Sequence, residues 1–237
     1  MGNVEERLGA FYAARAGEEP ASDPEALLRF DKAIAAAGLR PAERVLDLGA
    51  KWGGLAERAR QAGIEIEYTG LDLSEENCRK ARSLGFDVRR ADLTTRLPTE
   101  DGEFDCVFCL ELLEHLTSPV ALLAEIRRVL TKGGRAVISV PSPYSWVEVF
   151  RELFHRHDPE GHLNSFTTPV MRNVVGLAGF RLVQTLGTSV RIPRTIRLIP
   201  TNSILARSRI YVIRPSDEVV FAGRQLGALV HDRRSAD

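Results

Sequence analysis

The chain has 237 residues, 44% of them hydrophobic and 27% charged, and its 32 basic and 32 acidic residues give a formal net charge of zero. This length suits one α/β domain with enough apolar material for a core. The neutral balance differs from the basic character of a dedicated nucleic-acid binder, and no apolar run approaches the length of a membrane span. Because the N-terminus, MGNVEERLGAF, is charged and lacks a signal-peptide core, we expect a cytoplasmic protein.

The first 40 residues are expected to form a helical cap. Asp23 suits the N-cap of a helix over PEALLRFDKAIAAAG, with Pro24 in its first turn and Gly38 at its end. From Arg44 onward, strands and helices alternate, which predicts a parallel sheet with helices on both faces. The expected strands are RVLDL, IEYTGLDL, FDVRRADL, FDCVFCLEL and GRAVISVP, and the expected helices follow Gly53 and span Ser74 to Leu84 and Ser118 to Leu130.

The three cysteines are expected to be core thiols. They are odd in number, and Cys106 and Cys109 lie in FDCVFCL, which has the composition of a buried strand. Residues three apart on a strand point to opposite faces, so these two side chains are not expected to hold one metal ion or to form a disulfide.

Beyond Pro141 the sequence becomes rich in aromatic residues, histidine and arginine. A helix over TPVMRNVVGLAGF and strands over RLVQTLGT and RSRIYVIR are expected, and residues 215–237 read as a C-terminal tail. Residues 161–216 contain no Asp or Glu, and they carry eight arginines, at positions 172, 181, 191, 194, 197, 207, 209 and 214.

Four successive strands end in an acidic residue. Ligands of parallel α/β sheets bind at the carboxyl ends of the strands, and a glycine turn there lets the backbone approach a ligand closely. A carboxylate after the second strand can accept from ribose hydroxyls, and one after the third can accept from an adenine amino group. An adenosine-bearing ligand is therefore predicted beside the turn of Gly49 and Gly53 and the acids Asp47, Asp72, Asp92 and Glu111.

Over roughly residues 40–140 this series resembles the class I S-adenosylmethionine-dependent methyltransferases, of the type 11 and ubiquinone-biosynthesis O-methyltransferase kind. The resemblance implies a Rossmann-like, doubly wound α/β sheet of about seven strands, mostly parallel with an antiparallel last strand, for which SRIYVIR is the candidate. It implies a cofactor-binding domain over residues 41–214, with a basic, apolar, substrate-covering insertion at about 188–206. It implies that S-adenosylmethionine is bound by Asp47, Gly49, Gly53, Asp72, Leu73, Asp92, Leu93, Leu110 and Glu111.

A nicotinamide-dependent Rossmann enzyme is the alternative that also uses a glycine turn followed by an acidic residue. Its GxGxxG pattern does not fit, because position 51 is Lys and position 54 is the glycine that follows Gly53. Lys51 stands where the methyltransferase family has a middle glycine. Because lysine seldom adopts a positive φ, we expect φ below zero at Lys51.

The predicted reaction is methyl transfer to a small-molecule, lipid-linked or carrier-linked acceptor, with oxygen as the favoured atom. The sulfonium of the cofactor already activates the methyl group, so the protein must chiefly hold donor and acceptor in line. An oxygen acceptor can also need a base, and His115 and His162 are the candidate catalytic residues because imidazole titrates near neutral pH.

A divalent metal is a second interpretation of the same histidines. If residues 111–115 formed a helical turn, Glu111, Glu114 and His115 would share one face, and His162 could complete a set of two carboxylates and two imidazoles. This pattern resembles the metal-dependent branches of ubiquinone biosynthesis and of RNA 3′-terminal 2′-O-methylation, although many metal-free relatives resemble it too. An RNA 3′-end 2′-O-methyltransferase therefore stays an alternative, and so does a non-catalytic regulatory protein that binds the cofactor.

The acid-free segment suggests the chemistry of the acceptor. Its arginines favour phosphate or carboxylate, and its Ile, Leu and Pro residues favour an apolar body, so the predicted acceptor is both anionic and apolar. Peripheral contact with a membrane fits this chemistry, and nucleic acid is not the expected partner. Charge reversal at Arg194 and Arg197 should then raise the KM for acceptor alone, whereas a merely solvated arginine surface would leave it unchanged.

Overall fold

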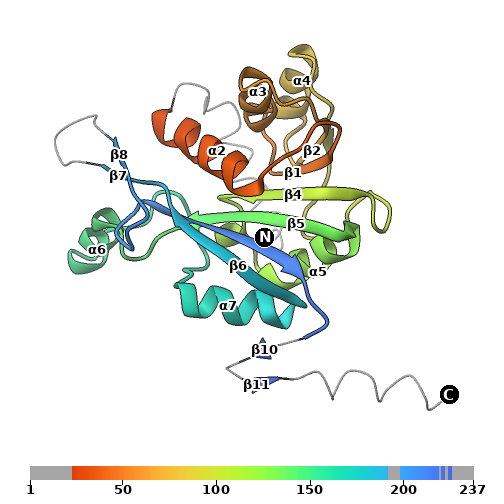
Figure 1. Cartoon of the computed structure of the whole chain (residues 1–237). Coiled ribbons are helices and arrows are strands. Elements are labelled where there is room, and N and C mark those ends of the chain that lie inside the picture. The colour runs from red at the N-terminus through yellow and green to blue at the C-terminus, as the bar shows by residue number, and fades with distance from the viewer. Residues whose placement is uncertain (1–22, 192–197, 219, 222–223, 226–237) are drawn as a thin grey trace, which may run out of the picture.

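The computed structural model describes residues 23–191, 198–218, 220–221 and 224–225 (Figure 1). The helices in these ranges are α2 (Pro24–Ala37), α3 (Gly54–Gln61), α4 (Glu75–Ser83), α5 (Pro119–Val129), α6 (Trp146–Leu153) and α7 (Thr168–Leu177), with a 3₁₀ turn at Leu113–His115. None of them is long and apolar enough to cross a membrane. The strands are β1 (Arg44–Leu48), β2 (Glu67–Asp72), β3 (Val88–Arg90), β4 (Phe104–Leu110), β5 (Leu130–Pro141), β6 (Phe180–Gly187), β7 (Ser189–Arg191), β8 (Leu198–Pro200), β9 (Ser208–Pro215), β10 (Val220–Phe221) and β11 (Arg224–Gln225).

Seven strands form one sheet in the order β3-β2-β1-β4-β5-β9-β6. The pairs from β3 to β5 are parallel, and β9 runs antiparallel to both of its neighbours, β5 and β6. The predicted mostly parallel α/β sheet is confirmed, including the antiparallel strand at SRIYVIR. Strand order reverses between β1 and β4, and such a switch point leaves a crevice at the carboxyl ends of the strands.

Helices cover both faces of the sheet (Figure 1). Ala33 and Ile34 of α2 and Leu55 of α3 pack against one face, and Leu123 of α5 and Met171 of α7 pack against the other. The two strand cysteines divide between these layers: Cys106 belongs to the α2 side, Cys109 belongs to the α5 side, and both are free thiols. The expectation of core thiols on opposite faces is confirmed.

The helix boundaries follow the predicted capping residues. The Asp23 side chain accepts a hydrogen bond from the amide of Glu25, and Gly38 ends α2 with φ at 58°. Ser74 caps α4 in the same way by accepting from Asn77. These short polar side chains accept hydrogen bonds from backbone amides that have no carbonyl partner in the first turn of a helix. Because this capping is local, the helix boundaries can be predicted from the sequence.

Two regions differ in detail from the predicted arrangement. The predicted strand GRAVISVP begins at Gly134, but β5 begins at Leu130 directly after α5, and its pairing with β4 jumps from Phe104–Leu130 to Cys106–Arg135. The extra residues form an irregularity that keeps the strand in the sheet. In the predicted insertion at 188–206, β7 and β8 form a two-stranded hairpin, while residues 192–197 lie outside the described ranges. Most of the predicted cap and tail, residues 1–22 and 226–237, also lies outside them.

Candidate functional site

A cavity of about 600 Å³ opens at the carboxyl ends of the central strands. It brings together residues from every motif of the predicted series and from α2, α6 and the turn before β9. Both predicted catalytic histidines, His115 and His162, line it. Eight of the nine predicted cofactor residues line it as well: Asp47, Gly49, Asp72, Leu73, Asp92, Leu93, Leu110 and Glu111.

The glycine turn after β1 makes three left-handed residues in a short span. Gly49, Lys51 and Gly53 have φ values of 74°, 48° and 86°. The expectation that Lys51 keeps φ below zero is therefore wrong. Its amide donates a hydrogen bond of 2.8 Å to the Asp72 carboxylate, and this bond to the next strand accompanies a conformation that lysine ordinarily avoids.

Gly53 stabilises the turn and does not line the cavity. It is absent from the lining residues, and its amide donates to the carbonyl of Ala50 at 2.9 Å. A Cβ on Gly53 would stand 2.6 Å from the Phe86 ring. The glycine is therefore required by the positive φ and by the close approach of Phe86 as α3 begins.

The Asp72 carboxylate organises the loop around itself. One oxygen accepts from the amide of Lys51, and the other accepts from the amide of Ser74 at 2.9 Å and from the side chain of Asn77 at 3.1 Å. The residue is only 7% exposed yet lines the cavity. Because each carboxylate oxygen offers about two acceptor directions, Asp72 retains capacity for ligand hydroxyls.

Asp47 is a buried acid of the site with a raised pKa. It is 5% exposed, and its described side-chain hydrogen bond is a 2.9 Å bond donated by the hydroxyl of Tyr68. Burial raises the pKa of Asp47, the hydrogen bond from Tyr68 lowers it in part, and the nearby Asp72 raises it. The resulting pKa is about 7. A cationic group of a ligand would stabilise the ionised form.

Asp92 and Leu93 lie just past the end of β3, where the predicted adenine contact was placed. Asp92 is exposed at the cavity rim, and one of its oxygens accepts from the amide and the hydroxyl of Thr94 at 2.9 and 2.7 Å. Leu93 is 7% exposed and supplies an apolar part of the wall. The pair offers one charged and one apolar surface to a planar ligand.

Glu111 has a different environment from the one its motif suggested. Its φ is 50°, and the 3₁₀ turn begins after it, so it does not share a helical face with Glu114. Its two oxygens accept from the hydroxyls of Ser139 and Ser208 at 2.7 and 3.1 Å, and a guanidinium nitrogen of Arg29 lies 3.9 Å away. The helical turn over residues 111–115 that the metal hypothesis required does not form as one unit: the chain turns left-handed at Glu111 to leave β4, and the 3₁₀ turn spans Leu113–His115.

Three of the four candidate metal ligands do meet. The ligand atoms of Glu114, His115 and His162 lie within 4.8 Å of one another, whereas Glu111 is outside this group. Glu114 is 1% exposed, neither of its carboxylate oxygens has a hydrogen-bond partner in the described part of the chain, and the two imidazole rings lie 4.9 Å apart. Burial and the nearby Glu111 raise the pKa of Glu114 well above its usual range. One buried carboxylate and two imidazoles fit a borderline divalent ion.

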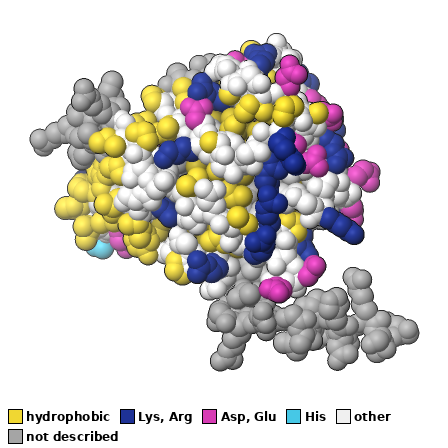
Figure 2. Space-filling view, in the orientation of Figure 1, with side chains coloured by type: hydrophobic (Ala, Val, Ile, Leu, Met, Phe, Trp, Pro, Cys, Tyr) yellow, Lys and Arg dark blue, Asp and Glu magenta, His cyan; other side chains and the backbone are white. Residues whose placement is uncertain are grey.

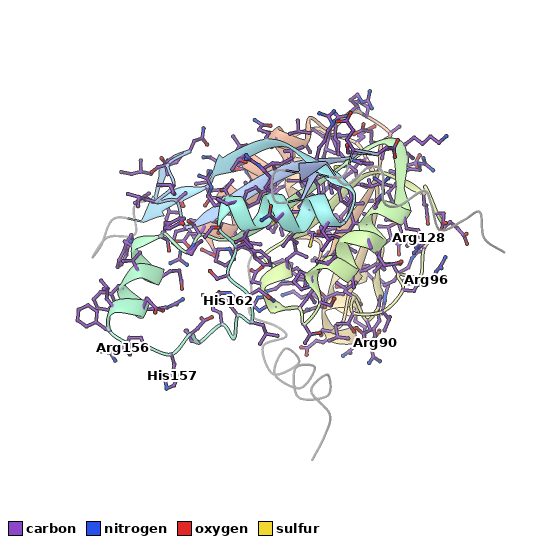
Figure 3. The ribbon with its side chains drawn as sticks, turned by 90° about the horizontal axis from the view of Figure 1, so that it is seen from below. Arg90, Arg96, Arg128, Arg156, His157 and His162 are labelled. Atoms are coloured by element: carbon purple, nitrogen blue, oxygen red, sulfur yellow. The ribbon has the colours of Figure 1, made fainter. Side chains whose placement is uncertain are left out.

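His162 reaches the cavity from the segment that follows α6. In Figure 3 it lies on the inner side of this segment, toward the body of the protein. Its Nδ1 is 2.8 Å from an Asp158 carboxylate oxygen, and its Nε2 is 3.5 Å from Glu160. Burial lowers the pKa of His162, but Glu160 and Asp158 outweigh burial and hold it above the usual histidine value. Asp158 thereby orients the ring and strengthens it as a base.

Sequence reasoning missed several residues that build the site. Asn77 and Tyr68 donate hydrogen bonds to Asp72 and Asp47, while Arg29 and Glu160 line the cavity. Only Asn77 had a local signal, since it lies in the first turn of the helix that is expected to begin at Ser74. The others lie on a strand, a helix face and a loop whose approach to the cavity depends on tertiary packing.

Four described residues of the acid-free segment line the cavity: His162, Thr188, Arg207 and Ser208. Arg207 lines it, but its guanidinium is paired at 3.1 Å with Glu25 of α2, which lines the same region. Arg194 and Arg197, on which the acceptor hypothesis chiefly rested, lie outside the described residues. Arg207 and Glu25 therefore offer paired charges to the cavity, whose wall also includes the apolar side chains of Phe30 and Leu116.

Comparison with known proteins agrees with the geometry. Residues 46–138 match the family described as "Methyltransferase domain". The chain is 30% identical over 148 residues to the ubiquinone biosynthesis O-methyltransferase of Xanthomonas campestris, a match that covers 57% of this chain and 61% of that protein. It is 31% identical over 201 residues to a 37.1 kDa protein in transposon TN4556 of Streptomyces fradiae, covering 82% and 57%.

Among solved structures, a Haloferax volcanii methyltransferase in complex with the Trm112 methyltransferase activator superposes with a TM-score of 0.68 at 20% identity, covering 88% of this chain and 97% of that one. This likeness shows the fold. The methyltransferase-domain match over residues 46–138 and the methyltransferase fold imply S-adenosylmethionine as the cofactor. The chain spans about six-tenths of the length of the curated relatives it matches, so their reactions and substrates enter only as proposals.

Proposed function

We propose that the protein transfers the methyl group of S-adenosylmethionine to a hydroxyl of an apolar acceptor. One observation carries the proposal: Asp47, Asp72 and Asp92, from successive strand ends, line one cavity that continues to His115 and His162. In this assignment Asp72 accepts from the ribose hydroxyls, Asp92 and Leu93 meet the adenine, and Asp47 faces the cationic methionine end of the cofactor. The O-methyltransferase names of the curated relatives support oxygen as the receiving atom.

In the proposed catalytic step, His162 acts as the general base. The acceptor oxygen attacks the methyl carbon, so the O–C bond forms as the C–S bond breaks, and the sulfur leaves with the electron pair as S-adenosylhomocysteine. The hydroxyl proton passes to an imidazole nitrogen of His162, whose other nitrogen is held by Asp158. His115, whose ring lies 4.9 Å from that of His162, orients the acceptor or takes the proton in its place. Alignment of donor and acceptor supplies much of the rate enhancement.

Calorimetry tests the cofactor assignment without knowledge of the acceptor. Wild-type protein should bind S-adenosylhomocysteine with micromolar affinity, and Asp72→Ala should weaken binding at least tenfold, which is about 1.4 kcal/mol. Asp101→Ala, an exposed carboxylate paired with Arg128, is the matched control. Normal folding without micromolar binding of either S-adenosylmethionine or its product would argue against the proposal.

Turnover tests the acceptor class. Protein and methyl-labelled cofactor are incubated with apolar phenols and with lipid-linked hydroxy acids, and methylated product is measured by mass spectrometry. His162→Ala should lower kcat by about 10²–10⁴-fold while leaving cofactor affinity unchanged. Strong cofactor binding with no product from any acceptor class would favour the regulatory, non-catalytic alternative.

Metal-assisted transfer is a second candidate function, favoured by the buried Glu114 carboxylate beside His115 and His162, whose oxygens accept no hydrogen bond from the described residues. These three residues would hold a divalent ion, and such an ion would supply Lewis acidity toward an acceptor hydroxyl. Metal analysis and isothermal titration with Zn²⁺ or Mg²⁺ test this assignment, using Glu114→Gln as the variant and Glu152→Gln, on the exposed surface of α6, as the control. Full activity after chelation, with no ion retained, would exclude it, and salt-sensitive RNA binding would bring back the RNA alternative.

A further inference from the structure

Helix α6 is amphipathic, but charged side chains of this helix face the protein and its apolar residues face solvent. Its charged residues Glu148 and Arg151 face inward, where they form a 2.7 Å ion pair and Glu148 lines the cavity. None of the residues of α6 is buried. The outward face carries the apolar residues, with Phe150, Leu153 and the adjoining Phe154 exposed by 48%, 70% and 58%. Leaving this much apolar surface in water is unfavourable unless something covers it.

This exposed face is part of a larger patch, which we call the α6 patch. Among the described residues, fifteen large apolar side chains are exposed, and ten of them lie in residues 144–163 and 199–205. The two segments are joined at Ser142, whose hydroxyl donates to the carbonyl of Ile204 and whose amide donates to that of Arg207. Figure 2 shows the hydrophobic side chains gathered at one edge of the molecule, over α6 and toward β7 and β8. The members of the α6 patch are Tyr144, Trp146, Val149, Phe150, Leu153, Phe154, Leu163, Ile199, Ile204 and Leu205.

The exposed tip of the segment after α6 is basic. His155, Arg156 and His157 follow α6 and are exposed, and Figure 3 shows Arg156 and His157 at the outer tip of this segment. Glu152 is the exposed acid within α6, whereas Asp158 and Glu160, farther along the segment, lie near His162 and Arg151. Aromatic and aliphatic residues with a basic margin are the combination that lets a helix lie in the interface of an anionic bilayer.

We propose that the α6 patch seats the protein on the surface of an anionic lipid bilayer. Phe150, Leu153 and Phe154 would enter the boundary between headgroups and acyl chains, and Arg156 would lie among the phosphates. Because Glu148 on the inner face of the same helix lines the cavity, the seated protein would present its acceptor side to the lipid surface. The proposal concerns binding alone and does not depend on methyl transfer.

Vesicle binding tests the proposal on the full chain without cofactor. Wild-type protein should co-sediment with phosphatidylcholine vesicles that contain about one-third phosphatidylglycerol, and less with phosphatidylcholine alone. The double variant Leu153→Ser/Phe154→Ser should bind more than about tenfold more weakly, because it removes two side chains that would enter the bilayer. Leu84→Ser, which changes a side chain that is 45% exposed at the end of α4, is the matched control and should bind normally.

Tryptophan fluorescence gives a second readout. The chain has two tryptophans; Trp52 is 8% exposed, and Trp146 at the start of α6 is 38% exposed. Anionic vesicles should shift the emission to the blue, and Trp146→Phe should remove that shift. Arg156→Glu should reduce binding only to anionic vesicles. Absence of binding to vesicles, equal binding by the double variant, or a concentration-dependent dimer that the double variant dissolves would each overturn the proposal, the last in favour of a second copy as the occupant.

Discussion

At the scale of single residues, the buried Asp47 carboxylate destabilises the apo protein when it is ionised. Its folded pKa of about 7 lies above the usual value near 4, so the apo protein is stabilised below pH 4 and loses that stability as the pH rises to 7. Asp47→Asn should therefore raise the thermal midpoint of the apo protein at pH 8, on the order of 5 °C. The same variant should weaken S-adenosylmethionine binding at pH 8, as measured by calorimetry.

The matched measurement repeats both experiments at pH 4. There the native Asp47 is already protonated, so the substitution should leave the midpoint nearly unchanged. Equal stabilisation at pH 4 and pH 8 would show that Asp47 is not a source of ionisation strain.

His162 and Asp158 supply a second residue-scale prediction. Asp158 holds Nδ1 of His162 at 2.8 Å and contributes to the raised pKa of the ring. Asp158→Asn should lower that pKa, and a base with a lower pKa would shift the rising limb of the pH–rate profile to lower pH. Titration of the His162 ring protons by nuclear magnetic resonance checks the shift without an acceptor. Asp101→Asn is the control, and no displacement in Asp158→Asn would mean that Asp158 only packs against the loop.

At the scale of elements, the joint between β1 and α3 depends on Gly53. Gly53→Ala would impose a positive φ on a residue with a Cβ and bring that Cβ to 2.6 Å from Phe86. We expect a loss of about 2 kcal/mol in the free energy of unfolding. Denaturant unfolding measures it, and Phe86→Ala in the same chain should make the further cost of Gly53→Ala smaller. Additive losses would indicate that the ring is not the obstacle. The matched control is Gly133→Ala, whose Cβ would meet nothing within 4 Å.

At the scale of the whole molecule, Arg135 connects α2 to the sheet through a buried ion pair and two hydrogen bonds. Arg135 of β5 lies 2.6 Å from Glu43, both are nearly excluded from solvent, and the same guanidinium donates to the carbonyls of Ala37 and Gly38 at the end of α2. Burial alone would raise the pKa of Glu43, but the bonds from Arg135 and Arg40 lower it to about 2. This stability is therefore present above the unfolded value near 4.5 and is lost as the pH falls toward 2.

Arg135→Met should cost about 3–5 kcal/mol in the free energy of unfolding, because it leaves the buried Glu43 carboxylate paired, among the described residues, with the exposed Arg40 alone. The double variant Arg135→Met/Glu43→Leu should recover part of that loss, and Arg96→Met, in an exposed pair with Asp101, should cost less than about 1 kcal/mol. Urea unfolding at pH 7 measures all three. A double variant less stable than Arg135→Met would contradict the interpretation.

The sequence by itself determined the elements and the sheet. Strand and helix periodicity, Asp23 as a cap, and Gly49 and Gly53 in the turn are local signals, and the position of Asp47 and Asp72 at strand ends follows from the parallel sheet. Such signals persist because hydrogen bonding and side-chain alternation repeat along a few residues.

Only the tertiary structure decided what those residues meet. Lys51 adopts a positive φ, and its backbone amide donates a hydrogen bond to Asp72. The Glu111 carboxylate accepts hydrogen bonds from Ser139 and Ser208 instead of sharing a helical face with Glu114. The outward apolar face of α6 likewise depends on which side of that helix the cavity occupies. The physical reason is that these contacts join segments far apart in the chain, and their approach is set by packing of the whole sheet and its loops rather than by any local period.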